Sequence, residues 1–287
     1  MAVLNVTPDS FSDGGRYLDP ASAAERAAAL VSEGADVLDI GGESTRPGAD
    51  PVDEAEELRR VLPVIERVRG TTRAPLSIDT MKSRVAREAV LAGASIVNDV
   101  SGGLADPAML GTVAELREGP QARDVHVVLM HRQGEPKTMQ EKPSYADPVA
   151  EVLDHLRSRA LAAEAAGIPR ERITLDPGIG FGKRLSHNLA LLANLRELRA
   201  LGYPILLGAS RKSFIGHITG AEEQHDWLAT ERKDVPSERI GGTAAAVTVG
   251  VLAGVDVLRV HDVAVMREVM LVAHAIAGSK GGTRGSV

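Results

Sequence analysis

The chain has 287 residues, enough for two average domains or for one α/β barrel of about 250 residues. Hydrophobic residues make up 44% of the sequence and charged residues 25%, which excludes a disordered or fibrous protein. The net charge of −6 excludes attraction of nucleic acid or an anionic membrane by the whole surface, so anionic ligands must bind through local groups. Cysteine is absent, which excludes disulfides, thiolate zinc sites and a cysteine nucleophile. Because the first residues also resemble neither a signal peptide nor a membrane span, we expect a cytoplasmic protein.

Short apolar segments rich in β-branched residues alternate along the chain with longer segments of helical periodicity. The predicted strands are Ala2–Val6, Val37–Ile40, Pro75–Ile78, Ser95–Val97, His126–Met130, Ile173–Leu175, Pro204–Leu207 and Val257–Val260. The predicted helices are Ala21–Glu33, Val52–Arg69, Ser83–Ala92, Pro107–Arg117, Pro148–Ala166, His187–Leu201, an interrupted region Ser213–Leu252, and Val263–Ile276.

Nearly continuous apolar strands separated by helices indicate a parallel sheet that is covered on both faces. Eight such units predict a single α/β domain with the architecture of a (β/α)8 TIM barrel, with its active site at the carboxyl ends of the strands. An open, doubly wound sheet is the structural alternative. We expect one domain over residues 1–277, a polar loop insertion at 221–238 and a disordered tail at 278–287.

Every predicted strand delivers a polar side chain to its carboxyl end. A single Asp after a strand is more often a helix N-cap than a catalytic group. In a parallel barrel, however, all eight ends converge on one site. The polar residues at these ends are Asn5, Asp39, Asp79, Asn98, Asp99, His131, Asp176, Ser210, Arg211, Lys212, Arg259 and His261.

The predicted site combines two kinds of chemistry. Its cationic side chains suit a phosphate or diphosphate, because arginine offers forked donors to oxyanions. Its carboxylates and amide suit a flat heterocycle that presents adjacent N–H donors. The cations are Arg46, Lys212, Arg259 and His261, and the acceptors are Asp79, Asn98 and Asp176.

Several loop and strand-end segments occur in the order of a known family. They are Asn5–Gly15, Gly41–Gly48, Ser77–Thr80, Ile96–Asp99, Met130–His131, Ser210–Ser213 and Arg259–Asp262. Together these segments resemble the dihydropteroate synthases of folate biosynthesis, and the match covers nearly the whole chain. The resemblance implies that residues 1–277 form a pterin-binding barrel. It also implies a transferase reaction between 6-hydroxymethyl-7,8-dihydropterin diphosphate and 4-aminobenzoate, which gives 7,8-dihydropteroate and diphosphate.

The resemblance further implies roles for individual residues, a magnesium ion held with the help of Asn5, and a homodimer. Asp79, Asp176 and Lys212 are the implied catalytic residues, and with Asn98 they bind the pterin. The implied diphosphate ligands are Asn5, Thr45, Arg46, Arg259 and His261. The implied aminobenzoate ligands are Thr45, Arg46, Pro47, Phe181, Lys212 and Ser213.

Two features depart from the family pattern. The chain begins about two residues into the first strand of that pattern, and Arg132 stands where the family often has an apolar residue, which we expect to alter the rim of the site. Asp39 is expected to position the second loop or a water on the metal.

Two other functions remain open from the residues alone. One is a pterin-dependent methyltransferase, which does not need Ser44–Pro47 or Ser210–Ser213, and the other is a non-catalytic pterin-binding module.

Overall fold

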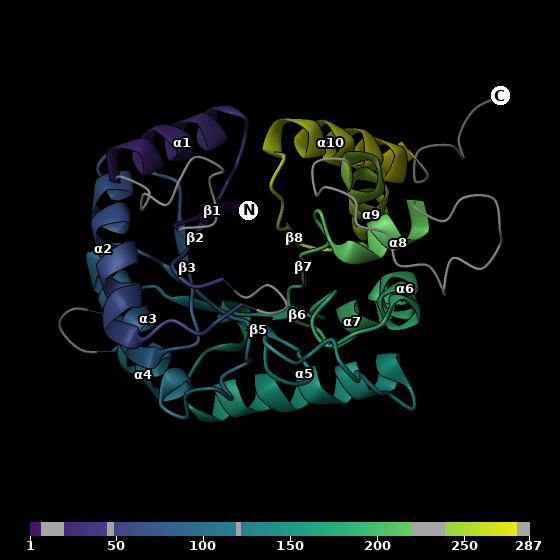
Figure 1. Ribbon diagram of the computed structural model, residues 1–287, viewed down its shortest axis with the longest axis horizontal. Helices are drawn as coiled ribbons and strands as arrows, with labels where there is room; N and C mark the ends of the chain where they lie inside the picture. The colour runs from purple at the N-terminus through teal and green to yellow at the C-terminus, as the bar shows by residue number, and fades with distance from the viewer. Residues whose placement is uncertain (7–19, 45–48, 119–121, 220–238, 280–287) are drawn as a thin grey trace, which may run out of the picture.

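Eight parallel strands form the centre of the computed structural model, which describes residues 1–6, 20–44, 49–118, 122–219 and 239–279 (Figure 1). The strands are β1 (Ala2–Asn5), β2 (Leu38–Gly41), β3 (Leu76–Asp79), β4 (Ile96–Asp99), β5 (His126–Met130), β6 (Ile173–Asp176), β7 (Leu206–Leu207) and β8 (Val257–Leu258). All eight predicted strands are therefore present in the described part of the chain.

The strands follow one another in chain order around the barrel. Strands β1 to β6 form one continuous parallel sheet, and β7 pairs with β8. Isolated parallel bridges join these two sheets at both edges, between Leu175 and Ile205 and between Ala2 and Val260. The predicted barrel architecture is confirmed, but the predicted lengths of β7 and β8 are wrong, because each has only two ladder residues. Pro204 has no N–H group for a ladder, and Val260 bonds to the first strand instead of extending β8.

Ten helices surround the strands in the described part of the chain (Figure 1). They are α1 (Pro20–Ser32), α2 (Glu54–Arg69), α3 (Ser83–Ala92), α4 (Met109–Glu115), α5 (Pro148–Ala165), α6 (Leu185–Ala193), α7 (Leu195–Arg199), α8 (Ser213–Thr219), α9 (Ile240–Ala253) and α10 (Val263–Ser279), with a 3-10 turn, η2, at Arg170–Arg172. None of these described helices is both long and apolar enough to span a bilayer.

The prediction of one helix over His187–Leu201 is wrong, because α6 and α7 meet at Asn194. The Asn194 side-chain amide donates to the carbonyl of Ala190 at 2.8 Å, and its φ of −115° leaves the helical range. Such side-chain competition with the backbone favours a helix end at asparagine. Helix α10 continues through Ser279, beyond the predicted domain end at 277, and residues 280–287 and 221–238 lie outside the described residues.

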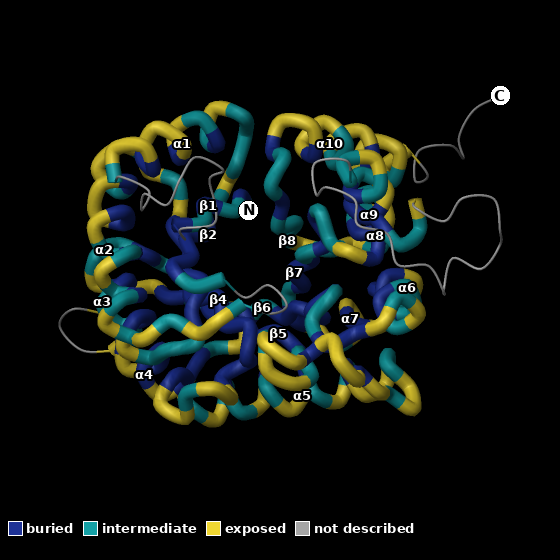
Figure 2. Tube along the Cα trace, viewed as in Figure 1, coloured by how far each residue is buried: buried dark blue, intermediate teal, exposed yellow. Residues whose placement is uncertain are grey.

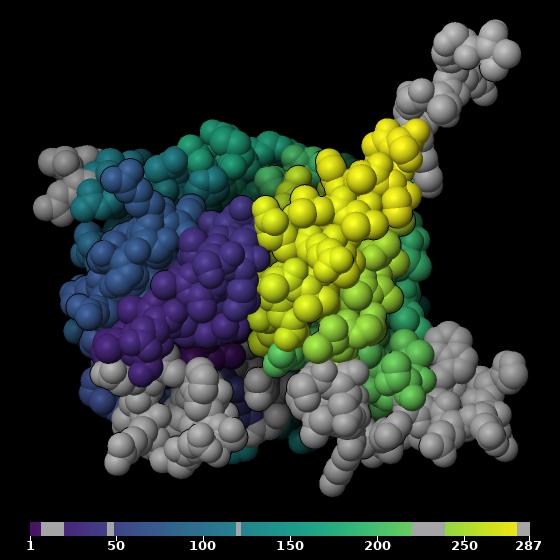
Figure 3. All heavy atoms as spheres, turned by 90° about the horizontal axis from the view of Figure 1, so that it is seen from above, coloured from purple at the N-terminus to yellow at the C-terminus, as the bar shows by residue number. Residues whose placement is uncertain are grey.

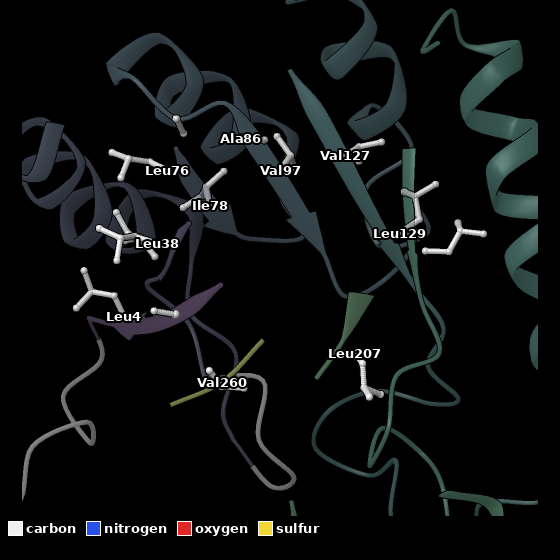
Figure 4. Close-up of a cluster of buried hydrophobic side chains, with 14 of the residues drawn as sticks. Leu4, Leu38, Leu76, Ile78, Ala86, Val97, Val127, Leu129, Leu207 and Val260 are labelled. Carbon is white, nitrogen blue, oxygen red and sulfur yellow. The ribbon is translucent and has the colours of Figure 1, made fainter. Parts of the chain in front are cut away.

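The core lies between the strands and the inner faces of the helices, as the buried segments in Figure 2 show. All four residues of β2 and of β3 are buried, which is typical of a parallel strand covered on both faces. Figure 4 shows part of this core, including Leu38, Leu76 and Ile78, which have no exposed surface. Helix α2 contributes its apolar face at helical spacing after an Asp53 N-cap. This close packing fixes the strand ends relative to one another.

Candidate active site

Arg259, directly after β8, joins this strand to β2 and β3. Its Nε donates to Oδ2 of Asp39 at 2.6 Å, and its Nη2 donates to Oδ2 of Asp79 at 2.8 Å. The Asn98 amide donates to the same Asp39 oxygen at 3.1 Å. Three of the predicted site residues, Asp79, Asn98 and Arg259, therefore meet, together with Asp39 from the interior of β2.

Asp39 and Asp79 are buried carboxylates with unused acceptor capacity. Oδ1 of each is buried and has no hydrogen-bond partner among the described residues. Burial raises the pKa of Asp79 to about 7, and the charge of Asp39 adds to this, while Arg259 opposes it. Although burial alone lowers it, the two carboxylates raise the pKa of Arg259. The arrangement therefore provides acceptors for a cationic or N–H-bearing ligand next to a permanent positive charge.

Asn5 ends β1 beside this cluster. Its register partner on β2 is Gly41. A Cβ atom on Gly41 would lie 3.6 Å from Oδ1 of Asn5 and 3.4 Å from Cβ of Asp79. The first strand thus delivers its polar end to the same site, as the sequence predicted.

The loop after β6 brings Asp176 and Phe181 next to Lys212. Asp176 is buried and accepts a hydrogen bond from the Gly178 N–H at 2.7 Å. Burial raises the pKa of Asp176, whereas this N–H group and the charge of Lys212 act in the opposite direction. The Lys212 ammonium lies 4.0 Å from the centre of the Phe181 ring, in a cation–π contact. The predicted pterin and aminobenzoate residues of this region are therefore neighbours, and Ser213 begins α8 directly after Lys212.

His261 is held by the loop after β7. Its N–H donates to Oγ of Ser210 at 3.2 Å, and its Nδ1 lies 3.1 Å from the same oxygen. Arg211, with a left-handed φ of 58°, binds Asp262 through two nitrogens. These contacts join the loops after β7 and β8, and they give Ser210, Arg211 and Asp262 supporting roles that the motif alone did not reveal.

A second buried ion cluster supports the stem of the loop after β2. The Lys82 ammonium lies 2.5 Å from a carboxylate oxygen of Glu43 and 2.5 Å from one of Glu57, which is fully buried. Burial raises the pKa of Glu57, and Lys82 opposes this shift. No sequence signal indicated this cluster, because Glu57 is one of several acidic residues at the start of an amphipathic helix.

The structure locates the remaining predicted residues only in part. Thr45, Arg46 and Pro47 lie outside the described residues. The Arg132 side chain is only 9% exposed, and its Nη2 donates to Glu135 at 3.1 Å. Among the residues that the structure describes, no cluster of three His, Cys, Asp or Glu side chains is arranged to hold a metal ion.

The sequence and the structure both match proteins of known function. Residues 1–261 match the pterin-binding enzymes. The dihydropteroate synthase of Escherichia coli strain K12 is 42% identical over 280 residues, which cover 98% of this chain and 92% of that protein.

Two solved structures of the Xanthomonas albilineans dihydropteroate synthase have the same fold. The structure with 4-aminobenzoic acid has a TM-score of 0.83 and 46% identity, covering 96% of this chain and 91% of that one. The structure with 7,8-dihydropteroate has a TM-score of 0.80 and 43% identity, covering 96% and 92% of the two chains.

The chain therefore belongs to the family of pterin-binding enzymes. Within this family it groups with the dihydropteroate synthases, transferases of folate synthesis, as the motifs predicted. This placement favours the synthase over the methyltransferase and the non-catalytic module.

Proposed function

We propose that the strand-end site joins the amine nitrogen of 4-aminobenzoate to the methylene carbon of 6-hydroxymethyl-7,8-dihydropterin diphosphate. The observation that carries this proposal is Arg259, a cation suited to an anionic ligand that is also hydrogen-bonded to the buried carboxylates Asp39 and Asp79. A substrate with a diphosphate at one end and a cationic, N–H-rich ring at the other matches both sides of this arginine. The ligands of the Xanthomonas relatives support the same choice.

The pterin edge faces the buried acceptors. Asp176 accepts from the pterin amino group and the adjacent ring N–H, because a carboxylate receives two parallel donors. Asp79 and Asn98 complete recognition of the ring, and Lys212 donates to its carbonyl side. The free Oδ1 of Asp79 supports this assignment, since a buried acceptor without a partner is costly until a ligand satisfies it.

The diphosphate lies on the other side of Arg259. A guanidinium has five N–H groups, of which Asp39 and Asp79 accept only two here. The remaining donors of Arg259, together with His261 and Asn5, are directed to the leaving group in this proposal. Thr45 and Arg46 complete the anion site by resemblance.

The reaction then requires charge separation within one site. The carbon–oxygen bond breaks and its electron pair leaves with the diphosphate, which Arg259 and His261 stabilise. The methylene carbon becomes cationic and is stabilised by the carboxylates of Asp79 and Asp176. The amine nitrogen of aminobenzoate forms the new bond to this carbon and releases a proton.

The aminobenzoate occupies the space between the loops after β6 and β7. Phe181, held against Lys212, packs on its ring. By resemblance, Thr45, Arg46 and Pro47 are further ligands of the aminobenzoate. The Ser213 hydroxyl binds the carboxylate. The exposure of Ser213 supports this role, because the group is accessible to a ligand from solvent.

We further propose that a magnesium ion binds with the diphosphate. Asn5 offers one hard oxygen ligand, and the buried, unpartnered Oδ1 of Asp39 is suited to orient a metal-bound water. This donor set fits an ion held mainly by phosphate oxygens and water. When bound, the ion supplies positive charge that neutralises the leaving group.

The active form proposed here is a cytoplasmic homodimer. Helices α9 and α10 lie side by side on one face, as Figure 3 shows in yellow-green and yellow. Val265, Val272 and Ile276 of α10 are 44–55% exposed and recur along one side of the helix. Val249 and Leu252 of α9 add to this apolar face. A second copy of the same face would bury these side chains, which favours a symmetric dimer.

A diphosphate-release assay tests the proposed function. Release is expected only when the pterin diphosphate, 4-aminobenzoate and magnesium are all present, with 7,8-dihydropteroate formed in equal amount. Binding of the pterin without turnover would support a binding module instead, and release that does not require aminobenzoate would indicate a hydrolase.

A further inference from the structure

We propose that Lys183 is a positioning residue that fixes the pterin and aminobenzoate subsites relative to each other. This inference rests on the proposed function and assigns a role to a residue outside the predicted ligand sets. Lys183 lies in the glycine-rich loop after β6 and is only 3% exposed, unlike an ordinary surface lysine.

The Lys183 ammonium is held by its own loop and by His131. It donates to Nδ1 of His131 at 2.8 Å and lies 3.3 Å from the His131 carbonyl oxygen. It also donates to the carbonyl oxygens of Gly178 at 2.9 Å and Phe181 at 3.1 Å. One side chain thus ties two points of the loop to the residue that follows β5.

Gly178 and Phe181 contact residues that are assigned to different substrates. Gly178 also donates its N–H to Oδ1 of Asp176, the carboxylate proposed to bind the pterin, and Lys183 holds Gly178 through its carbonyl oxygen. Phe181 presents its ring to Lys212 on the aminobenzoate side. Lys183 is therefore hydrogen-bonded to the backbone on both sides of the junction between the two substrates.

Other tethers of this loop act elsewhere. Asn188 accepts from the Gly180 N–H at 2.7 Å, and the Tyr145 hydroxyl donates to the Gly182 carbonyl at 2.9 Å. Neither contact involves the carbonyl of Gly178 or Phe181. The Gly178 carbonyl also accepts from the Phe181 N–H at 3.1 Å, so these two residues form one turn. Loss of the Lys183 donors would therefore remove the side-chain link from this turn to His131, while the rest of the loop stays attached.

The charges around Lys183 agree with this role. His131 is neutral, because burial lowers its pKa to about 2, so Nδ1 is able to accept. The ring of His155 packs edge-on against His131, with 4.7 Å between centres. Burial lowers the pKa of Lys183 to about 7, with Asp176 opposing this shift and Lys212 adding to it. The cation in turn opposes the rise that burial causes in the pKa of Asp176.

The test is a comparison of Lys183→Met with Lys142→Met, which makes the same substitution at an exposed position. Two constants are measured: the Kd for 6-hydroxymethyl-7,8-dihydropterin by calorimetry, and the Michaelis constant for the aminobenzoate substrate at saturating pterin diphosphate. Both constants are expected to rise by about tenfold in Lys183→Met and to stay within twofold in the control. Neither constant depends on the fraction of protein that is folded, so a purely structural role would leave both unchanged.

His131→Asn provides a second variant if Lys183→Met does not fold. Both constants should rise in this variant whether or not Lys183→Met folds. Where Lys183→Met does fold, the double variant should be no worse than Lys183→Met, because the two side chains act as one unit. Constants within twofold of wild type, or a change in only one of them, would overturn the proposal. Wild-type protein that releases no diphosphate would instead refute the proposed function, and the two failures are thus distinguishable.

Discussion

Buried carboxylates, two of them with unpartnered acceptor atoms, carry most of the chemistry of this site. Asp39, Asp79 and Asp176 are at most 6% exposed, yet each lies next to a cation or an N–H donor. Isolated buried charges are expensive, so removing one partner of these pairings is costly. The unpartnered oxygens of Asp39 and Asp79 remain for a ligand.

Asp176→Asn should abolish tight pterin binding. The amide keeps an oxygen for the Gly178 N–H but places N–H donors against the N–H groups of the pterin. An unsatisfied buried polar pair costs about 1–3 kcal/mol, and more when a charge is lost. Titration with the pterin diphosphate is the measurement, and an affinity within twofold of wild type would remove Asp176 from the site.

Arg259→Ala and His261→Ala separate anion capture from pterin recognition. Turnover should fall roughly a hundredfold in Arg259→Ala, because removing a donor to a developing anion costs on the order of 2.7–4 kcal/mol. The loss should be smaller in His261→Ala. Free pterin should bind His261→Ala normally, but it should bind Arg259→Ala more weakly, since Asp79 loses its partner.

The measurements are steady-state turnover and direct titration with 6-hydroxymethyl-7,8-dihydropterin. If His261→Ala loses pterin affinity as severely as turnover, His261 belongs to the pterin pocket and the proposed division of the site is wrong.

Ionisation of Asp79 should give the pH profile of kcat/KM an acid limb near neutral pH. Its pKa is raised to about 7, so the carboxylate is protonated below that pH and ionised above it. Because the ionised form stabilises the cationic carbon, kcat/KM for the pterin diphosphate should rise as the pH increases through about 7. In Asp79→Asn the activity should be lower and this limb should disappear. A limb that persists unchanged in the variant would assign it to another group.

At the level of structural elements, the position of the loop after β6 depends on the backbone conformation of Gly178. Gly178 has a φ of 66°, and a Cβ atom there would lie 2.0 Å from the carbonyl oxygen of His131. Only glycine fits this contact without displacing the backbone. The close approach of Gly178 to His131 brings the carbonyl oxygens that bind the Lys183 ammonium next to the end of β5.

Gly178→Ala should therefore displace the loop and weaken binding of both substrates by at least about tenfold. Gly111→Ala is the matched control, because Gly111 lies in α4 with no heavy atom within 4 Å of the added Cβ. That control should be neutral or stabilising by up to about 1 kcal/mol. Thermal unfolding and pterin titration of both variants are the measurements. Wild-type affinity in Gly178→Ala would show that the loop tolerates the shift.

For the whole molecule, the apolar face of α9 and α10 determines the expected assembly. Val272→Glu introduces a charge at the centre of this face and should convert a dimer to monomers, because an unpaired charge is costly at a buried interface. Leu161→Glu is the control, since Leu161 is equally exposed, at 55%, but lies on α5. Sedimentation velocity measures the oligomeric state of both variants. A dimer that survives Val272→Glu would place the interface elsewhere.

The periodicity of the sequence predicted the eight units, their order and the barrel, because parallel buried strands and amphipathic helices leave local patterns. It also predicted Asn5, Asp79, Asn98 and Asp176 at the strand ends, since these residues directly follow apolar runs. The resemblance to the synthases supplied the roles that composition alone left open. The break at Asn194 was missed because its side-chain contact to Ala190 competes with an otherwise helical pattern.

Only the tertiary structure decided how the charged residues pair. Arg259 binds Asp39 across 220 residues of sequence, a distance over which no local pattern carries information. Lys183 resembles a surface lysine in a glycine-rich loop, and Glu57 resembles a solvent-facing helix residue, yet both are buried. Closure of the barrel brings these groups into a region of low dielectric constant, where each must find a partner. The sequence by itself thus determined that Asn5, Asp79, Asn98 and Asp176 lie at the carboxyl ends of their strands. The packing of the barrel determined which charged groups neutralise one another and which acceptors remain unpartnered.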